Sequence, residues 1–136
     1  MTRYLRPIGV IPPVRTQYGE AEQVAQAYAE NSFDLVHSTR SLNNAYDPVK
    51  AIEAAVHVVR PGGFVYLAHM LNDGGGKGYG GPHPWNFGVE AGSFTITSKS
   101  GQRTDMTKAL AGLACVMHSV RNGMLFVRIQ KNQPGP

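Results

Sequence analysis

The sequence predicts an α/β fold in which parallel strands alternate with helices and an antiparallel hairpin ends the chain. Segments with strand and helix patterns alternate from Val14 to His69 and are joined by short loops, which is typical of βαβ units with right-handed crossovers. Near the C-terminus, Asn122-Gly123 separates two apolar segments. Asn-Gly in that setting is the strongest short-range signal of a hairpin.

The N-terminal half supplies most of the alternating elements. Val14–Tyr18 alternates apolar and polar residues and predicts a short strand, and the good helix formers of Glu20–Ala29 predict a helix. Phe33–Ser38 and Phe64–His69 predict two further strands. The second of these is almost entirely apolar, as expected for a strand in a sheet that is covered on both faces.

The helix between these two strands has clear signals at both ends. Asp47-Pro48 provides an N-cap followed by proline at the first helical position, and apolar residues then recur at helical spacing as far as Val59. Pro61-Gly62-Gly63 ends the helix and predicts a tight reversal into the next strand.

The region after His69 is less regular. Residues 70–81 are rich in glycine and predict a loop without regular structure. Ser93–Thr97 predicts a strand that pairs back through Arg103, and Thr107–Leu113 predicts a short helix. The two strands of the terminal hairpin are expected at Ala114–Val120 and Met124–Gln130.

Composition and charge exclude several classes of protein. A chain of 136 residues fits one domain, and 42% hydrophobic with 16% charged residues predicts a folded core. The sequence has no apolar run long enough to cross a membrane and no signal-peptide pattern, so we expect a cytoplasmic protein without a membrane partner. The net charge is +4, but the basic residues are scattered, which argues against binding to nucleic acid.

Metal and redox chemistry are not expected either. No spacing of histidines or carboxylates matches a metal site. Cys115 is the only cysteine, which excludes an intrachain disulfide. Because apolar residues flank it on both sides, we expect its thiol to be buried and inert.

A series of motifs resembles the class I S-adenosylmethionine-dependent methyltransferases, in particular those of type 11. Gly19-Glu20-Ala21 corresponds to the Gly-Asp-Ala of that family, Ser32–Val36 to the Ser-Phe-Asp-Leu-Val of its fourth strand, and Arg60–Gly63 to the Lys-Pro-Gly-Gly before its fifth strand. With the terminal hairpin, the resemblance covers about Val14 to Lys131. It implies a partial Rossmann-like sheet in a single domain over residues 1–136, with S-adenosylmethionine as the cofactor.

The resemblance also assigns part of a cofactor pocket. Glu20 and Ala21 stand where an acid and the next backbone N–H of the family meet the adenine ring. Ser38 and Thr39 follow at the carboxyl end of the family's fourth strand, where open α/β sheets place ligands. The alternative for Glu20 is an acid at a helix N-terminus that interacts only with the helix dipole. Both interpretations of Glu20 remain open.

Residues after the fifth strand of the family are candidates for substrate binding. His69 ends that strand, and His83 and Trp85 follow the glycine-rich loop, in the region where the family builds its substrate pocket. An imidazole beside a cleft can serve as a general base, whereas packing is the alternative for His83 and Trp85. Asn43 and Asn44 either contact a substrate or satisfy loop backbone groups. The catalytic residues remain unknown.

The sequence lacks elements that the family uses to hold its cofactor. The family's first strand, the GxGxG loop after that strand and the acid that ends its second strand have no counterpart, because the sequence begins where the family finishes its second helix. The glycines that begin at Gly74 cannot substitute, because they follow the fifth strand and do not open a helix after the first. We therefore expect an N-terminally truncated domain in which cofactor binding is impaired.

The missing strands change the expected sheet. The family order 3-2-1-4-5-7-6 reduces to 3-4-5-7-6 if Val14–Tyr18 moves beside Phe33–Ser38. An exposed apolar edge remains a liability, so we expect a homodimer or a partner chain to cover it. Two functions stay open: a methyltransferase-like protein that binds S-adenosylmethionine or another small molecule, and a non-catalytic interaction or regulatory module of the same fold.

Overall fold

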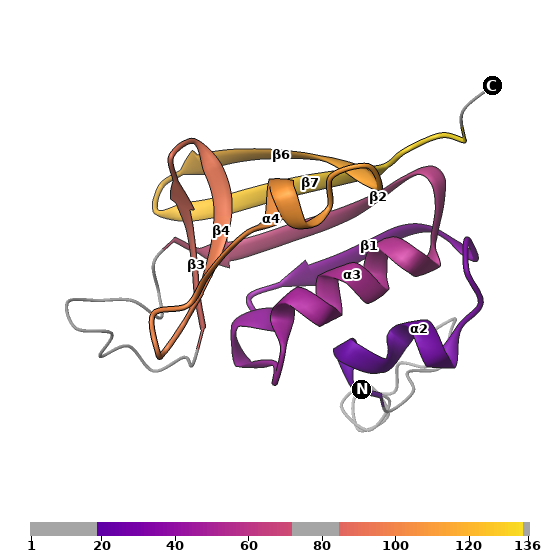
Figure 1. Ribbon diagram of the computed structural model, residues 1–136, viewed down its shortest axis with the longest axis horizontal. Coiled ribbons are helices and arrows are strands. Elements are labelled where there is room, and N and C mark those ends of the chain that lie inside the picture. The colour runs from indigo at the N-terminus through magenta and orange to yellow at the C-terminus, as the bar shows by residue number, and fades with distance from the viewer. Residues whose placement is uncertain (1–18, 72–84, 135–136) are drawn as a thin grey trace, which may run out of the picture.

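A computed structural model describes residues 19–71 and 85–134 and contains a four-stranded and a three-stranded sheet (Figure 1). The four-stranded sheet has the order β1-β2-β7-β6. Its strands are β1 (Phe33–Thr39), β2 (Val59–Met70), β7 (Met124–Lys131) and β6 (Ala114–Arg121). β1 pairs parallel with β2, and the other neighbours pair antiparallel. The α/β class and the terminal antiparallel hairpin are therefore confirmed.

The strand order agrees with the expected order as far as the description reaches. β1-β2-β7-β6 corresponds to the 4-5-7-6 part of the order expected from the sequence. The strand expected at Val14–Tyr18 lies outside the described residues, so its place beside β1 stays a prediction. Within the described residues β1 is an edge strand.

The helix expected at Glu20–Ala29 is shorter than predicted. It consists of the 3-10 turn η2 (Ala21–Gln23) and one turn of α-helix, α2 (Val24–Ala27). It ends because the backbone of Tyr28 is extended, with φ −132° and ψ 149°. The Tyr28 ring packs edge-on against Phe33, with the ring centroids 5.0 Å apart.

The second helix begins as its signals indicate but ends at Val58, and Val59 and Pro61–Gly63 belong to β2. α3 (Pro48–Val58) starts after Asp47, whose Oδ1 accepts the Lys50 N–H at 3.1 Å. Before it, the loop after β1 forms the 3-10 turn η3 (Leu42–Asn44). α3 buries one apolar side, including Ile52, against the sheet.

The reversal expected at Pro61–Gly63 is a bulge within β2. Phe33 pairs with Val59 and Leu35 with Phe64, so residues 60–63 of β2 have no regular partners on β1. An added Cβ at Gly63 would lie 2.6 Å from Val59 Cγ1 and 2.8 Å from the Asp34 carbonyl oxygen. Only glycine lets the two backbones approach this closely.

The three-stranded sheet contains one strand that the sequence analysis missed. β4 (Ser93–Ser98) pairs with β5 (Arg103–Asp105) as predicted. The short helix expected at Thr107–Leu113 starts one residue earlier and is shorter, as α4 (Met106–Ala109). β3 (Trp85–Glu90) also pairs with β4 and was not predicted. Its apolar residues at 85, 87 and 89 alternate with its other residues, which is a strand signal, but Gly88 and the preceding glycines obscured it.

All described covering elements pack on one face of the four-stranded sheet. α3, α4 and the three-stranded sheet share one apolar core with that sheet (Figure 1). The sheet residues on this face are almost fully buried: Val65, Leu67, Leu125, Val127 and Ile129. No described helix or strand covers the opposite face, where Leu35 and Met117 each remain 51% exposed.

The terminal hairpin has the turn that its sequence predicts. Asn122 and Gly123 both have positive φ, 52° and 75°, as a two-residue turn between twisted strands requires. One expectation in this hairpin is wrong: Cys115 is exposed and not buried. Its neighbour Ala114 points into the core, and successive residues of a strand point to opposite faces.

None of the helices within residues 19–71 and 85–134 is both long and apolar enough to span a membrane.

We predict that Gly63→Ala destabilises the fold by about 1–3 kcal/mol, because the added methyl group must push apart the backbones of β1 and β2. The matched control is Gly19→Ala, since an added Cβ at Gly19 meets nothing within 4 Å. Urea denaturation of both variants measures the difference. Equal midpoints would show that the bulge relaxes around the methyl group.

Candidate functional site

A crevice lies between η2 and the loop that carries η3. Its volume is about 250 Å³, and its lining residues are Glu20, Ala21, Glu22, Ser41, Leu42, Asn44, Ala45 and Tyr46. The loop follows the carboxyl end of β1, which is the end at which open α/β sheets bind ligands. The structure thus places the predicted adenine-binding pair Glu20-Ala21 opposite the loop after β1.

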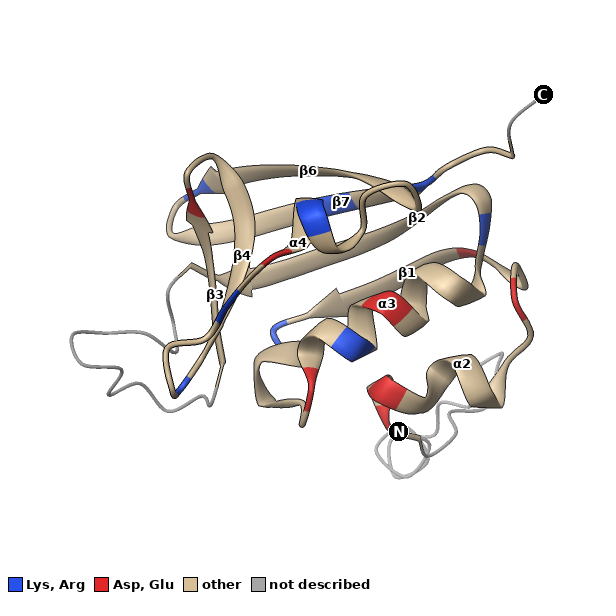
Figure 2. Ribbon diagram, in the orientation of Figure 1, with Lys and Arg blue, Asp and Glu red and all other residues tan. Residues whose placement is uncertain are grey.

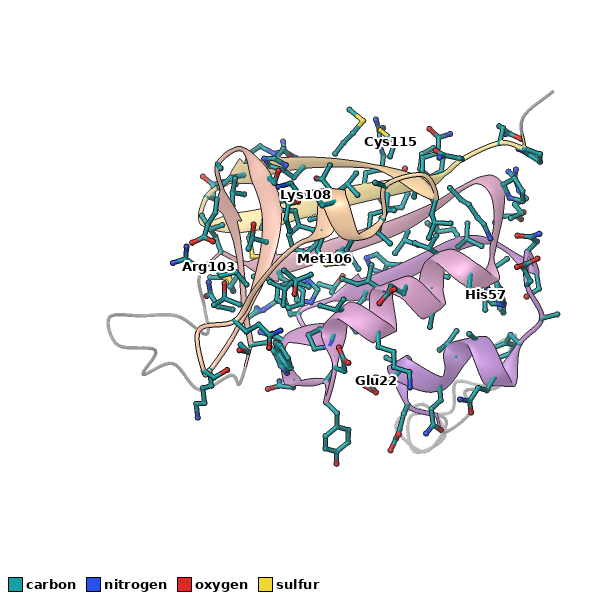
Figure 3. The ribbon with its side chains drawn as sticks, viewed as in Figure 1. Glu22, His57, Arg103, Met106, Lys108 and Cys115 are labelled. Carbon is teal, nitrogen blue, oxygen red and sulfur yellow. The ribbon has the colours of Figure 1, made fainter. Side chains whose placement is uncertain are left out.

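Hydrogen bonds hold the two walls of the crevice. The loop is tightened by the Ala45 N–H, which donates to the Leu42 carbonyl at 3.0 Å. Across the crevice, the Asp47 N–H donates to Glu22 Oε1 at 3.4 Å. Glu22 lies on η2, below the N-terminal part of α3 (Figure 3). The hydrogen bond between Asp47 and Glu22 therefore fixes the distance between η2 and the loop that leads into α3.

Glu20 is exposed at the mouth of the crevice. Its backbone carbonyl accepts the Gln23 N–H at 3.0 Å, but its side chain makes no capping hydrogen bond to the helix. The first N–H groups of a helix lack intrahelical acceptors, so Ala21 presents a backbone donor beside the Glu20 carboxylate. The pair offers an acceptor and a donor side by side, which suits the edge of an adenine ring.

Ser38 and Thr39 lie on opposite faces of the sheet, because they are neighbours on one strand. Ser38 Oγ is 2.7 Å from Ser41 Oγ, so Ser38 is hydrogen-bonded to a residue that lines the crevice. Thr39 Oγ1 instead bonds His37 Nε2 at 2.8 Å on the uncovered face. The structure brings Ser38, but not Thr39, close to Glu20 and Ala21.

His69 supports the crevice loop from within the core. Its side chain is 1% exposed, its ring centroid lies 4.4 Å from that of Phe87, and its Nε2 accepts the Leu42 N–H at 3.2 Å. Accepting this bond makes Nε2 the unprotonated nitrogen. A residue that binds a substrate or acts as a general base has to contact the substrate. The buried His69 imidazole instead holds η3 in place through Leu42.

Trp85, the other predicted substrate residue that the structure describes, does not line the crevice. Trp85 opens β3 and packs, partly buried, against the core, and β3 contacts η3. His83 lies outside the described residues. In the described part of the chain, no three His, Cys, Asp or Glu side chains form a group that fits a metal ion.

Asn43, for which the sequence left substrate contact and a loop backbone role open, is buried in the structure. The residue is 4% exposed, and its Oδ1 is buried without a hydrogen-bond partner. Buried polar atoms are nearly always paired, so an unpaired one in a loop beside a crevice suggests a missing polar group. An asparagine in a loop ordinarily serves the backbone, and no sequence signal separated Asn43 from Asn44.

Comparison with known proteins agrees with this geometry. Residues 2–67 match the sequence model of a family described as a methyltransferase domain. Over 50 residues, the chain is 40% identical to the ubiquinone/menaquinone biosynthesis C-methyltransferase UbiE of Bdellovibrio bacteriovorus. In sequence, this chain is therefore similar to methyltransferase domains over residues 2–67. The match to UbiE covers 37% of this chain and only 21% of that enzyme. The activity and the substrate of UbiE therefore do not follow for this chain.

Solved structures share the fold of this chain. A putative S-adenosylmethionine-dependent methyltransferase from Listeria monocytogenes aligns with a TM-score of 0.61 at 11% identity, over 94% of this chain and 73% of that chain. One from Mesorhizobium loti aligns with a TM-score of 0.55 at 12% identity, over 93% and 74%. Both are named for S-adenosylmethionine, which is the cofactor of this family.

We predict that His69→Phe destabilises the protein by about 1–3 kcal/mol, because the buried Leu42 N–H loses its acceptor. His69→Gln keeps an acceptor and should lose less. The matched control is His37→Phe on the exposed face of β1, which should stay within about 0.5 kcal/mol of the wild type. Urea denaturation measures all three, and wild-type stability of His69→Phe would contradict the supporting role.

Proposed function

We propose that this chain is a methyltransferase-like domain that binds S-adenosylmethionine, or its demethylated product, weakly through the crevice. The observation that carries the proposal is the crevice itself, in which Glu20-Ala21 faces the loop after β1. The relationship to the methyltransferase family supports the choice of ligand.

The residues present fit one end of the cofactor. The Glu20 carboxylate can accept from the adenine amino group, while the Ala21 N–H donates to a ring nitrogen. Pockets for drug-sized ligands span roughly 300–1,000 Å³, and the crevice is smaller, at about 250 Å³. It suits a purine ring better than the whole cofactor.

The unpaired oxygen of Asn43 supports a polar occupant near this loop. Leaving a buried acceptor without a partner costs about 1–3 kcal/mol. A donor brought by a ligand, or by a conformational change of the loop on binding, would recover that free energy. The Ser38 and Ser41 hydroxyls supply further polar groups at the same strand end.

When bound, S-adenosylmethionine supplies an electrophilic methyl group on its sulfonium centre. The part that this chain plays is binding and orientation, which can account for much of the acceleration of a methyl transfer. Glu20 and Ala21 would fix the adenine end, and His69 would hold the η3 loop against it. Activity of the chain alone would then depend on how much of the cofactor the crevice can hold.

A second candidate function is a non-catalytic interaction or regulatory module. It is favoured by β1, which is an edge strand among the described residues and exposes the apolar Phe33 and Leu35. A structural neighbour at 13% identity and TM-score 0.56 is a putative methyltransferase in complex with the Trm112 methyltransferase activator of Haloferax volcanii. For this chain we propose that a second copy pairs with the β1 edge.

We predict saturable binding of S-adenosylmethionine and S-adenosylhomocysteine at about 100 μM, which corresponds to roughly 5.5 kcal/mol. Glu20→Ala should weaken binding at least fivefold because the adenine acceptor is lost. The matched control is Glu53→Ala on the exposed side of α3, which should bind like the wild type. Isothermal titration calorimetry measures these affinities, and no heat at millimolar ligand would refute the cofactor proposal.

We also predict a concentration-dependent dimer that Leu35→Lys converts to monomer, because a lysine on an edge strand opposes pairing. Leu113→Lys is the matched control, since Leu113 is equally exposed but lies outside β1. Size-exclusion chromatography with light scattering, in reducing buffer, measures the mass. A monomer at every concentration would remove the homodimer.

A further inference from the structure

The side of the four-stranded sheet that no described helix or strand covers is here called the open face, and all four strands contribute side chains to it. His37, Tyr66, Arg128 and Met117 are direct cross-strand neighbours in one row across β1, β2, β7 and β6. The next row brings Ala68 beside Phe126. The open face thus combines apolar side chains with arginine at the centre of the sheet.

This surface is hollowed. A depression of about 690 Å³ lies over it, with Tyr66, Met117, Phe126, Arg121 and Arg128 in its lining. In α/β proteins, helices cover the faces of a sheet. A helix is the secondary structure that fits a shallow apolar trough over four strands, because its ridges pack along a twisted sheet.

Charge on the sheet is one-sided. β2, β6 and β7 contain no acidic residue, and the Asp34 carboxylate of β1 is paired with Arg60 at 2.8 Å. Figure 2 shows the acidic residues concentrated on η2, α3 and the segments around them, and on the three-stranded sheet. The open face therefore presents positive charge without neighbouring carboxylates among the described residues.

The two arginines of the open face are held by apolar groups. The Arg121 guanidinium lies 5.4 Å from the centroid of Phe126, and that of Arg128 lies 5.8 Å from the centroid of Phe64. Arg128 Nη2 also contacts Met117 Sδ at 3.2 Å. Neither guanidinium forms an ion pair with a carboxylate in the part of the chain that the structure describes. Both remain available to carboxylates of another molecule.

Charge also discriminates among possible occupants. A second copy packed face to face would bring Arg121 and Arg128 near their own counterparts. The first eighteen residues of the chain carry Arg3, Arg6 and Arg15 and no acid, so they do not complement the surface either. Two arginines are few for tracking a phosphate backbone, and Tyr66, Phe126 and Met117 line the depression beside them.

We propose that the open face docks an amphipathic helix of a partner protein, with an apolar stripe flanked by glutamates or aspartates. The stripe would lie over Tyr66, Phe126 and Met117, and the acids would meet Arg121 and Arg128. At about 3.3 Å per residue, Phe64–Met70 of β2 spans roughly 20 Å. A helix of about 13 residues has the same length. This binding is independent of cofactor binding at the crevice, which lies at the ends of the strands.

Fluorescein-labelled designed peptides test the proposal on the full chain. One is an 18-residue helix with leucines along one side and glutamates flanking them, and the other has lysines in place of the glutamates. Fluorescence anisotropy should show the acidic peptide binding at least tenfold more tightly than the basic one at low salt. This preference should shrink as salt rises. Equal affinities would overturn the proposal.

Charge reversal supplies the decisive comparison. The double variant R121E and R128E should reverse the preference so that the basic peptide binds more tightly. Lys108→Glu is the matched control, because Lys108 is exposed on α4, which packs on the covered side of the sheet (Figure 3). It should retain the wild-type preference. An unchanged preference in the double variant would place the peptide elsewhere and refute docking on the open face.

Cys115 offers a local readout. It is the only cysteine and is exposed on β6, directly opposite Gln130 and two residues from Met117. An environment-sensitive dye on Cys115 should respond to the acidic peptide and not to the basic one. Two further measurements could overturn the proposal. Tight binding of a labelled oligothymidine that is lost in the R121E and R128E double variant would make the open face a nucleic-acid surface. Self-association that is lost in the same variant would make a second copy the occupant.

Discussion

The fold depends on burial of one face of the β1-β2-β7-β6 sheet. β2 lies inside this sheet, and its residues Val65 and Leu67 enter the same core as Leu125, Val127 and Ile129 of β7. α3, α4 and the three-stranded sheet all use that one face, so their positions follow from a single apolar surface. The opposite face keeps aromatic and arginine side chains exposed to solvent. The core and the open face that we propose as a docking surface are thus the two sides of the same strands.

The core and the crevice are linked through His69. Its ring packs in the core against Phe87, while its Nε2 binds the Leu42 N–H of the loop after β1. The three-stranded sheet therefore contributes to the crevice indirectly, because β3 carries Phe87 and fixes the imidazole that holds the loop. A ligand that moves this loop must also disturb the contact between His69 and Phe87 in the core. The loop side of the crevice is therefore rigid, whereas the opposite wall, which contains Glu20, is exposed.

Local signals were sufficient where a few neighbouring residues determine the backbone. Asp47-Pro48 specifies the start of α3, and Asn122-Gly123 specifies a turn with positive φ, so both were predicted from the sequence. The Glu20-Ala21 pair came from the family resemblance, and the structure supplied its opposite wall. Properties that depend on distant residues were not predictable: the exposure of Cys115 depends on which face of the sheet is uncovered, and the burial of Asn43 depends on how η3 folds back over β2.

The exposed thiol of Cys115 has a practical consequence. A lone accessible cysteine on an edge strand has no partner within its own chain, and two copies can join through it when oxidant is present. β6 and β1 are the opposite edges of the four-stranded sheet, so such a covalent link would connect molecules along an edge different from the one that β1 leaves open. Oxidative storage would therefore produce chains of molecules with mixed linkages, and their mass would rise with the age of the sample.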